Sequence, residues 1–147
     1  MKFDSSLKVK EALSLFFSHY HFKDGGYNDK FFKIKIGKIF IPLPNISARV
    51  KVARLHDIHH VLTEYNADWK GEVEIGIWEL RTGCGKYWVA WLLNSIAVCI
   101  GLILYSKSIK QAYRRALNSK TNIYHLNLSY EELIDMNIGE LRNKIFM

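Results

Sequence analysis

The sequence is poor in cysteine and proline, with two of each among its 147 residues. Cys84 and Cys99 lack the spacing of a metal site and form no disulfide framework, so the chain suits a reducing compartment better than a secreted one. No signal peptide is expected, because the first apolar run, Ala12 to Phe17, is short and follows charged residues. Internal repeats and low-complexity segments are also missing. A chain of this length is expected to fold as one domain, 1–147, without disulfides.

Acidic residues are scarce as well, because 14 Asp and Glu face 21 Lys and Arg and leave a net charge of +7 at pH 7. Such an excess predicts an anionic partner or surface. The basic residues are not interleaved with aromatic ones as in single-strand binders, and they form no DNA-reading motif. Nucleic acid is therefore not expected as a partner.

The most apolar stretch runs from Tyr87 to Tyr105, carries no charge, and is followed by basic residues at Lys107, Lys110, Arg114, Arg115 and Lys120. Its length approaches the ~20 residues that span a bilayer core, and Tyr and Trp stand near its ends. This pattern predicts membrane association with two alternatives. One is a single pass through about 87–105 with the basic flank on the cytoplasmic side. The other is a buried helix in a protein that only touches the membrane, because Asn94, Ser95, Cys99 and Gly101 make the stretch less apolar.

Residue periodicity predicts a mainly α fold, a compact helical domain with a small β-hairpin. Helices are expected over 7–20, 47–64, 69–81 and 87–105. The hairpin is expected over 32–36 and 39–41, ended by Pro42 and Pro44. A short strand is predicted at 123–126. Asp68 is expected to cap the helix that begins at Trp69, and Ser129 with Glu132 has the spacing of a capping box for a helix at Tyr130.

The polar residues His56, Asp57, His60 and Glu72 are the candidate metal ligands. On a helix, His56 and His60 lie one turn apart and point the same way, whereas Asp57 lies roughly 100° round from His56. Glu72 falls in the first turn of the next helix. Two helices joined by a short loop pack antiparallel, so Glu72 is expected beside His60. Two imidazoles with carboxylates suit a divalent metal, zinc first, with iron or manganese as alternatives.

Neighbouring polar residues have other expected roles. Glu64 and Glu79 continue the two helix faces and are candidates to orient the imidazoles by accepting their free N–H groups. The alternative role of Glu79 is an exposed partner for Lys or Arg. His59 is expected to be a solvated side chain rather than a ligand, and His19 and His21 have little support as ligands. The four candidate ligands could instead form a hydrogen-bonded polar cluster without metal.

The His-Asp-x-x-His pattern followed by eleven residues and Glu resembles the signature of the fourth coenzyme Q (ubiquinone) biosynthesis protein family, the Coq-four-like proteins. It reads LHDIHHVLTEYNADWKGEVEIGIWEL over 55–80. Gly71-Glu72 and Trp78-Glu79 match that family's Gly-Glu and Phe/Trp-Glu pairs. The ending YRRALNSKTNIYHLNLSYEELIDMNIGELRNKI is also similar to the family's C-terminus, so the resemblance covers about 47–145. The N-terminal part, the loop Glu64-Tyr65-Asn66 and segments 24–45 and 83–86 depart from it. The chain thus resembles a short, divergent member of bacterial type.

The resemblance implies a metal-dependent protein that binds a prenylated aromatic lipid or another amphipathic quinone precursor. Members of the family are implicated in removing the ring carboxyl of a prenylated 4-hydroxybenzoate and hydroxylating the vacated carbon. The metal would bind an oxygen of the aromatic head, the apolar helix 87–105 would hold the tail, and the basic flank would hold the protein at an anionic leaflet. Other lipid-biosynthesis enzymes and a second copy of the chain are further expected partners.

Two other classes stay open. One is a non-catalytic scaffold that binds prenyl lipid and gathers biosynthetic enzymes, with a structural metal. The other is an HD-type phosphohydrolase, because LHDIHH is superficially similar to that superfamily's core doublet. Such an enzyme needs an upstream His and a distant downstream Asp, for which His19, His21 and Asp135 are available but poorly placed.

Overall fold

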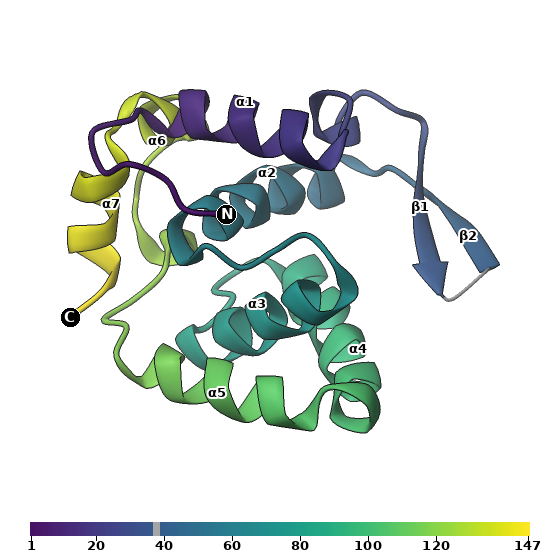
Figure 1. Cartoon of the computed structure of the whole chain (residues 1–147). Coiled ribbons are helices and arrows are strands. Elements are labelled where there is room, and N and C mark those ends of the chain that lie inside the picture. Colours follow the sequence, from purple (N-terminus) through teal and green to yellow (C-terminus); the bar gives the residue numbers. More distant parts are fainter. Residues whose placement is uncertain (37–38) are drawn as a thin grey trace.

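The computed structural model describes the backbone of residues 1–36 and 39–147, and the side chains of these residues apart from Asp24 and 33–36 and 39–41. The described residues form seven α-helices and a two-stranded antiparallel sheet (Figure 1). In chain order the elements are α1 (Val9–Tyr20), η1 (Asp24–Gly26), β1 (Phe31–Ile36), β2 (Ile39–Pro44), α2 (Ser47–Thr63), α3 (Trp69–Thr82), α4 (Trp88–Leu104), α5 (Ser106–Leu117), η2 (Ile123–His125), α6 (Tyr130–Asp135) and α7 (Ile138–Ile145). The predicted mainly helical fold with a small hairpin is confirmed.

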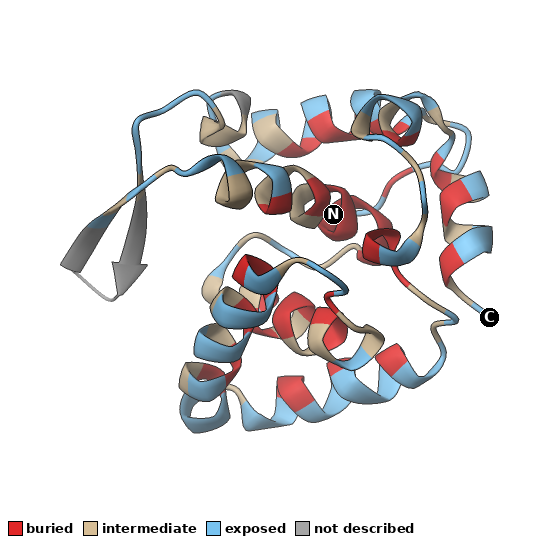
Figure 2. Cartoon of the chain, turned by 180° about the vertical axis from the view of Figure 1, so that it is seen from behind, coloured by how far each residue is buried: buried red, intermediate tan, exposed pale blue. Residues whose placement is uncertain are grey.

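Helix α2 lies at the centre of the helical arrangement. It packs against α1 and α7 on one side and against α3 and α4 on the other, and α3, α4 and α5 pack against one another. The hairpin projects away from the helices (Figure 1). Buried residues gather on the faces that the helices turn toward one another (Figure 2). The fully buried side chains include Phe16, Ile58, Leu62, Trp78 and Leu141, so the main core joins both sides of α2.

The helix ends follow the capping rules that the sequence indicated. The Asp68 side chain accepts a hydrogen bond from the Gly71 backbone N–H at 2.8 Å, which satisfies a donor of the first turn of α3. Ser129 and Glu132 form a reciprocal capping box at the start of α6. These two predicted caps are confirmed, and the expected helix bounds differ from the observed ones by one or two residues, as is usual at frayed ends.

Two predicted β features are wrong. Pro42 does not end the hairpin, because β2 continues to Pro44, with Pro42 opposite Lys33 and Pro44 opposite Phe31, whereas Pro44 is the last residue of β2 as predicted. A two-stranded sheet leaves each strand one free edge, so a residue without an N–H fits there. The residues at 123–126 form the 3-10 helix η2 rather than a strand. The Asn122 side chain accepts the Tyr124 N–H at 2.8 Å, and this local turn overrides the β preference of Ile123. Residues 37–38 of the expected hairpin lie outside the described residues.

Helix α4 has one buried face and one exposed apolar face. Its buried residues are Val89, Ala90, Asn94, Val98 and Gly101. A side chain on Gly101 would place its Cβ 2.3 Å from the Val73 side chain, so α3 and α4 approach closely here. Among the described residues, no helix is long and apolar enough to cross a bilayer, and the expected single pass through 87–105 is therefore not found.

Gly71 lets the chain between α2 and α3 fold tightly over the start of α3. A Cβ at Gly71 would lie 1.8 Å from the Asn66 carbonyl oxygen, whereas a Cβ at Gly76, in the same helix, would meet its nearest atoms at 3.6 Å. We expect Gly71→Ala to lower the free energy of unfolding by about 2–3 kcal/mol, because backbone must move. Gly76→Ala is the matched control, and we expect it to be neutral or to stabilise by up to about 1 kcal/mol through helix propensity. Urea denaturation measures both, and equal effects would contradict the close approach.

Candidate metal centre

Two helices bring three candidate ligands together. Helix α2 places His56 and His60 one turn apart, and the first turn of α3 places Glu72 opposite them. His60 Nε2 lies 3.2 Å from His56 Nε2 and 3.3 Å from one Glu72 oxygen, and His56 Nε2 lies 3.3 Å from the other oxygen. Among the described residues, these three side chains form a group that could hold a metal ion between α2 and α3.

Hydrogen bonds at the far side of each ring fix the state of these imidazoles. His56 Nδ1 lies 2.9 Å from Glu79 Oε1, and His60 Nδ1 lies 3.1 Å from the Tyr65 carbonyl oxygen. Both partners are acceptors, so each Nδ1 carries the proton and donates it. In the neutral tautomers both Nε2 atoms then present lone pairs. Two lone pairs and the Glu72 carboxylate therefore face one another around a common centre that requires a positive charge.

Either a proton or a metal ion could supply that charge. Burial lowers the pKa of His56, but Glu79 and Glu72 raise it by a larger amount. The pKa of His56 therefore lies well above its ordinary value. Burial raises the pKa of Glu72, but His60 and His56 lower it by a larger amount. The pKa of Glu72 therefore lies well below its ordinary value. A charge-assisted hydrogen bond measures about 2.7–2.9 Å. The contacts of His56 Nε2 with His60 and Glu72 are longer, at 3.2 and 3.3 Å. These distances are too long for strong hydrogen bonds made by one shared proton.

The spacing of the two ring nitrogens fits a bound metal better. Two ligands of a tetrahedral zinc ion with bonds of about 2.0–2.1 Å lie roughly 3.3–3.4 Å apart. The His56 and His60 Nε2 atoms are separated by 3.2 Å. Glu72 faces the outside with 40% of its side chain exposed, while His60 is 1% exposed. A metal here would thus be held from the protein side by the buried His60 and the half-buried His56, and it would have access to solvent or substrate beside Glu72.

Glu79 is a fully buried carboxylate that holds the histidines in place. Its Oε1 accepts hydrogen bonds from His56 Nδ1 at 2.9 Å and His59 Nδ1 at 2.7 Å. Its Oε2 accepts from Asn94 Nδ2 at 2.5 Å and the Tyr124 hydroxyl at 3.0 Å. The predicted role of Glu79 in orienting an imidazole agrees with these contacts. The alternative of an exposed partner for Lys or Arg is wrong, because Glu79 is 0% exposed.

His59 is buried, so the expectation of a solvated side chain is wrong. Its Nε2 accepts a hydrogen bond from the Ile123 backbone N–H at 3.2 Å, and its Nδ1 donates to Glu79. Both ring nitrogens are therefore engaged within the fold, and His59 has no lone pair left for a metal. The apolar residues one helical turn away on either side of His59, Leu55 and Leu62, were the signal that this face points inward.

Asp57 is not part of the three-residue group. Its carboxylate accepts a short hydrogen bond from the Tyr27 hydroxyl, on the segment that precedes β1. Burial raises the pKa of Asp57, and the Tyr27 hydrogen bond opposes that shift. Burial and the Asp57 charge in turn raise the pKa of Tyr27. The predicted position of Asp57, about a quarter turn from His56, explains why it reaches a different partner.

Glu64 does not orient an imidazole, so its predicted role is wrong. It follows the end of α2 with a left-handed φ of 62°, and its side chain accepts a hydrogen bond from Arg142 at 2.7 Å. The left-handed turn at Glu64 instead redirects the chain so that the next carbonyl, that of Tyr65, accepts the His60 N–H. No sequence pattern marked Tyr65, because its contribution is a backbone atom.

The residues that an HD-type phosphohydrolase would need do not join the group. His19 and His21 are exposed at the end of α1, and Asp135 pairs with Lys10 at 2.7 Å.

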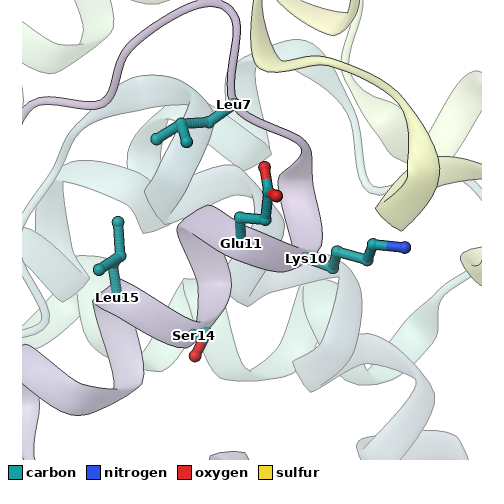
Figure 3. A pocket seen from close by; sticks show the side chains of 5 residues that line it. All are labelled: Leu7, Lys10, Glu11, Ser14 and Leu15. Atoms are coloured by element: carbon teal, nitrogen blue, oxygen red, sulfur yellow. The ribbon is translucent and has the colours of Figure 1, made fainter.

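A hollow on the outer side of α1 is lined by Leu7, Lys10, Glu11, Ser14 and Leu15 (Figure 3). Its two charged residues already serve the fold, because Glu11 accepts the Lys8 backbone N–H at 2.8 Å. Both charged side chains of this hollow are therefore already paired within the fold.

Comparison of the chain with protein-family models, with curated proteins and with solved structures found no match.

Proposed function

We propose that this protein is metal-dependent and membrane-associated, and that it binds or acts on a prenylated aromatic lipid. The observation that carries the proposal is the convergence of the His56 and His60 lone pairs with the Glu72 carboxylate, a donor set for a divalent metal. Zinc suits two imidazoles and a carboxylate best, and iron or manganese are the alternatives. The lipid is inferred from the resemblance of residues 47–145 to the Coq-four-like family.

A metal with three protein ligands supplies Lewis-acid polarisation of a carboxylate or phenolate oxygen at its open position. The chain's own residues would prepare that position. Glu79 and the Tyr65 carbonyl hold the two imidazoles in their metal-binding tautomers. Asp57, held by Tyr27, would serve as a fourth ligand or as a proton acceptor next to the site. Loss of the ring carboxyl as CO₂, with a proton taking its place, balances without an oxidant, whereas hydroxylation of the vacated carbon requires one.

The exposed face of α4 supports membrane association. Large apolar side chains recur along it at helical spacing: Trp88, Trp91, Leu92, Ile96, Leu102, Ile103 and Leu104 are each 42–86% exposed. Lys107 and Lys110 follow at the start of α5 and are also exposed. An apolar helix face with two tryptophans and adjacent lysines is typical of a helix that lies in the interface of an anionic membrane. We call this set of seven apolar residues the α4 face.

We expect the α4 face to insert into vesicles that contain an anionic phospholipid. Brominated acyl chains should quench the fluorescence of Trp88 and Trp91, and raised salt should weaken binding because screening reduces the contribution of the lysines. Leu102→Ser with Ile103→Ser should lower the vesicle partition coefficient about a hundredfold or more, because roughly 1.5–3 kcal/mol is lost per large apolar side chain. Leu15→Ser, at an exposed leucine of α1, is the matched control. Unchanged binding in the double variant would contradict a role for this face.

The proposed substrate class is tested by binding of 3-geranyl-4-hydroxybenzoate to the metal-loaded protein in mild detergent. Isothermal titration should show binding that weakens more than tenfold in Glu72→Gln or after chelation, because the head group loses its metal contact. Geraniol, which has neither carboxylate nor phenolate, should bind without sensitivity to metal. Equal binding of the benzoate by wild type and Glu72→Gln would exclude a metal contact with the head group.

A lipid-binding scaffold is the second candidate function. It is favoured by the position of the group, because a metal held by His56, His60 and Glu72 would tie α2 to α3 and so stabilise the fold. In that case substitution of a ligand should lower stability and partner binding together. CO₂ release from the same benzoate separates the two candidates, since a scaffold releases none with or without metal.

A further inference from the structure

A second hollow lies on another face of α2, away from the candidate metal ligands. It measures about 710 Å³, is open to solvent on one side, and is lined by the first half of α2, by Lys86 and Tyr87, and by Tyr124 and residues 126–131. His56, His60 and Glu72 do not line it. A volume of this size is in the range of sites for small organic ligands, about 300–1,000 Å³.

Three cations surround this hollow. Lys51 and Arg54 come from α2 and Lys86 from the turn before α4, whereas the one acidic residue of the lining is Glu131. None of these four side chains forms an ion pair in the part of the chain that the structure describes. Arg54 as a whole is half-buried, so part of its guanidinium side chain lines the hollow while its Nε is buried.

Aromatic rings form the walls between these cations. The Lys51 and Lys86 ammonium groups each lie 6.0 Å from the centre of the Tyr87 ring, and the Arg54 guanidinium lies 5.3 Å from that of Tyr130. Tyr124 adds a third ring to the lining. The rings hold the cationic side chains near the hollow and provide flat apolar surfaces on which a planar group can pack.

We propose that this hollow binds a phosphomonoester that carries an aromatic ring. A carboxylate brings one negative charge and needs one cation, whereas three unpaired cations with one facing acid match a group with two charges. A phosphate monoester is close to a dianion at neutral pH and has several acceptor oxygens for the lysine and arginine side chains of the lining. The ring of the ligand packs against the tyrosines. None of the three candidate metal ligands lines this site, and the two sites share a neighbour in Tyr124, whose hydroxyl donates a hydrogen bond to Glu79.

Phenyl phosphate is the probe, measured by isothermal titration at low and raised salt. Wild-type protein should bind it, and both benzoate and inorganic phosphate should bind at least about tenfold more weakly, because each lacks one half of the ligand. Arg54→Gln should weaken binding of phenyl phosphate about tenfold, and Lys51→Gln and Lys86→Gln severalfold, through loss of charge-assisted contacts. Lys51 and Lys86 are exposed, so these two variants keep the test valid even if Arg54→Gln unfolds.

Two variants serve as controls. Lys110→Gln removes an exposed lysine of α5 that does not line the hollow, and it should leave binding unchanged. Glu72→Gln removes a candidate metal ligand and should also leave it unchanged, which separates this inference from the proposed metal-dependent function. No binding of phenyl phosphate at millimolar concentration, or equal binding in Lys51→Gln and Lys110→Gln, would overturn the assignment. Equal affinity for inorganic phosphate would overturn the aromatic part of it.

Discussion

Protein purified without added metal is expected to contain about one divalent metal ion per chain, and His60→Ala and Glu72→Ala are each expected to contain less than about a tenth of that. In wild type, two lone pairs and a carboxylate converge within 3.2–3.3 Å contacts. Removal of any one leaves two protein ligands, which hold zinc weakly. Plasma mass spectrometry measures the metal content. At metal concentrations a thousandfold above Kd, binding should stabilise the fold by about 4 kcal/mol, so chelation should lower the melting temperature of wild type only.

The control variants replace the same residue types, a histidine and a glutamate, at positions outside the candidate metal site. His19→Ala removes an exposed histidine of α1, and Glu74→Ala removes a glutamate of α3 that pairs with Lys70 at 3.1 Å. Both should retain the metal. Asp57→Asn decides between the two proposed roles of Asp57, because a fourth ligand would be needed for tight binding and a neighbouring proton acceptor would not. If the wild type contains no metal and has the same melting temperature as a folded His60→Ala variant, the four residues form a hydrogen-bonded polar cluster and not a metal site.

The candidate site was predictable where local periodicity decides the geometry. The four-residue spacing of His56 and His60 places both imidazoles on one face of α2, and Asp68 marks where α3 begins and so where Glu72 lies. Glu79 follows from the same periodicity, two turns beyond Glu72. These residues needed no tertiary information beyond the rule that a short loop returns the chain beside the preceding helix.

The rest depended on contacts between distant residues or on backbone atoms. Asn94 and Tyr124 complete the Glu79 hydrogen bonds across 15 and 45 residues of sequence, and no local pattern marks them. The role of Glu64 could not be predicted because a left-handed turn removes its side chain from the helix face. The apolar stretch 87–105 was ambiguous for a different reason. Apolar residues occur all round this helix, so its sequence does not show which side of α4 packs on α3. The close approach of Gly101 to Val73 determines that side, and it is a contact between two helices that the local sequence does not reveal.

Glu79→Ala is expected to lower the free energy of unfolding by about 3–5 kcal/mol, the cost of breaking a buried charged network by removing one partner. Four donors, from His56, His59, Asn94 and Tyr124, would lose their acceptor, a carboxylate that is fully buried. Glu79→Gln keeps the volume but turns an amide toward these donors, so an intermediate loss is expected. Urea denaturation measures both variants. Metal affinity should also fall about 10- to 100-fold in Glu79→Gln, because the carboxylate fixes the tautomer of His56.

The pH dependence of stability separates the charge of Glu79 from its packing. Burial raises the pKa of Glu79, but His56 and His59 lower it by a larger amount. The pKa of Glu79 therefore lies well below its ordinary value of 4.5. A depressed carboxyl pKa contributes stability that is present above pH ~4.5 and is lost as the pH falls toward the folded-state pKa. In chelated samples, the stability difference between wild type and Glu79→Gln should therefore shrink between about pH 5 and 3. Glu74→Gln, at a partly exposed ion pair, should stay within about 0.5 kcal/mol of wild type throughout. A difference between wild type and Glu79→Gln that does not change with pH would mean that shape alone, and not the ionised carboxylate, holds the histidines.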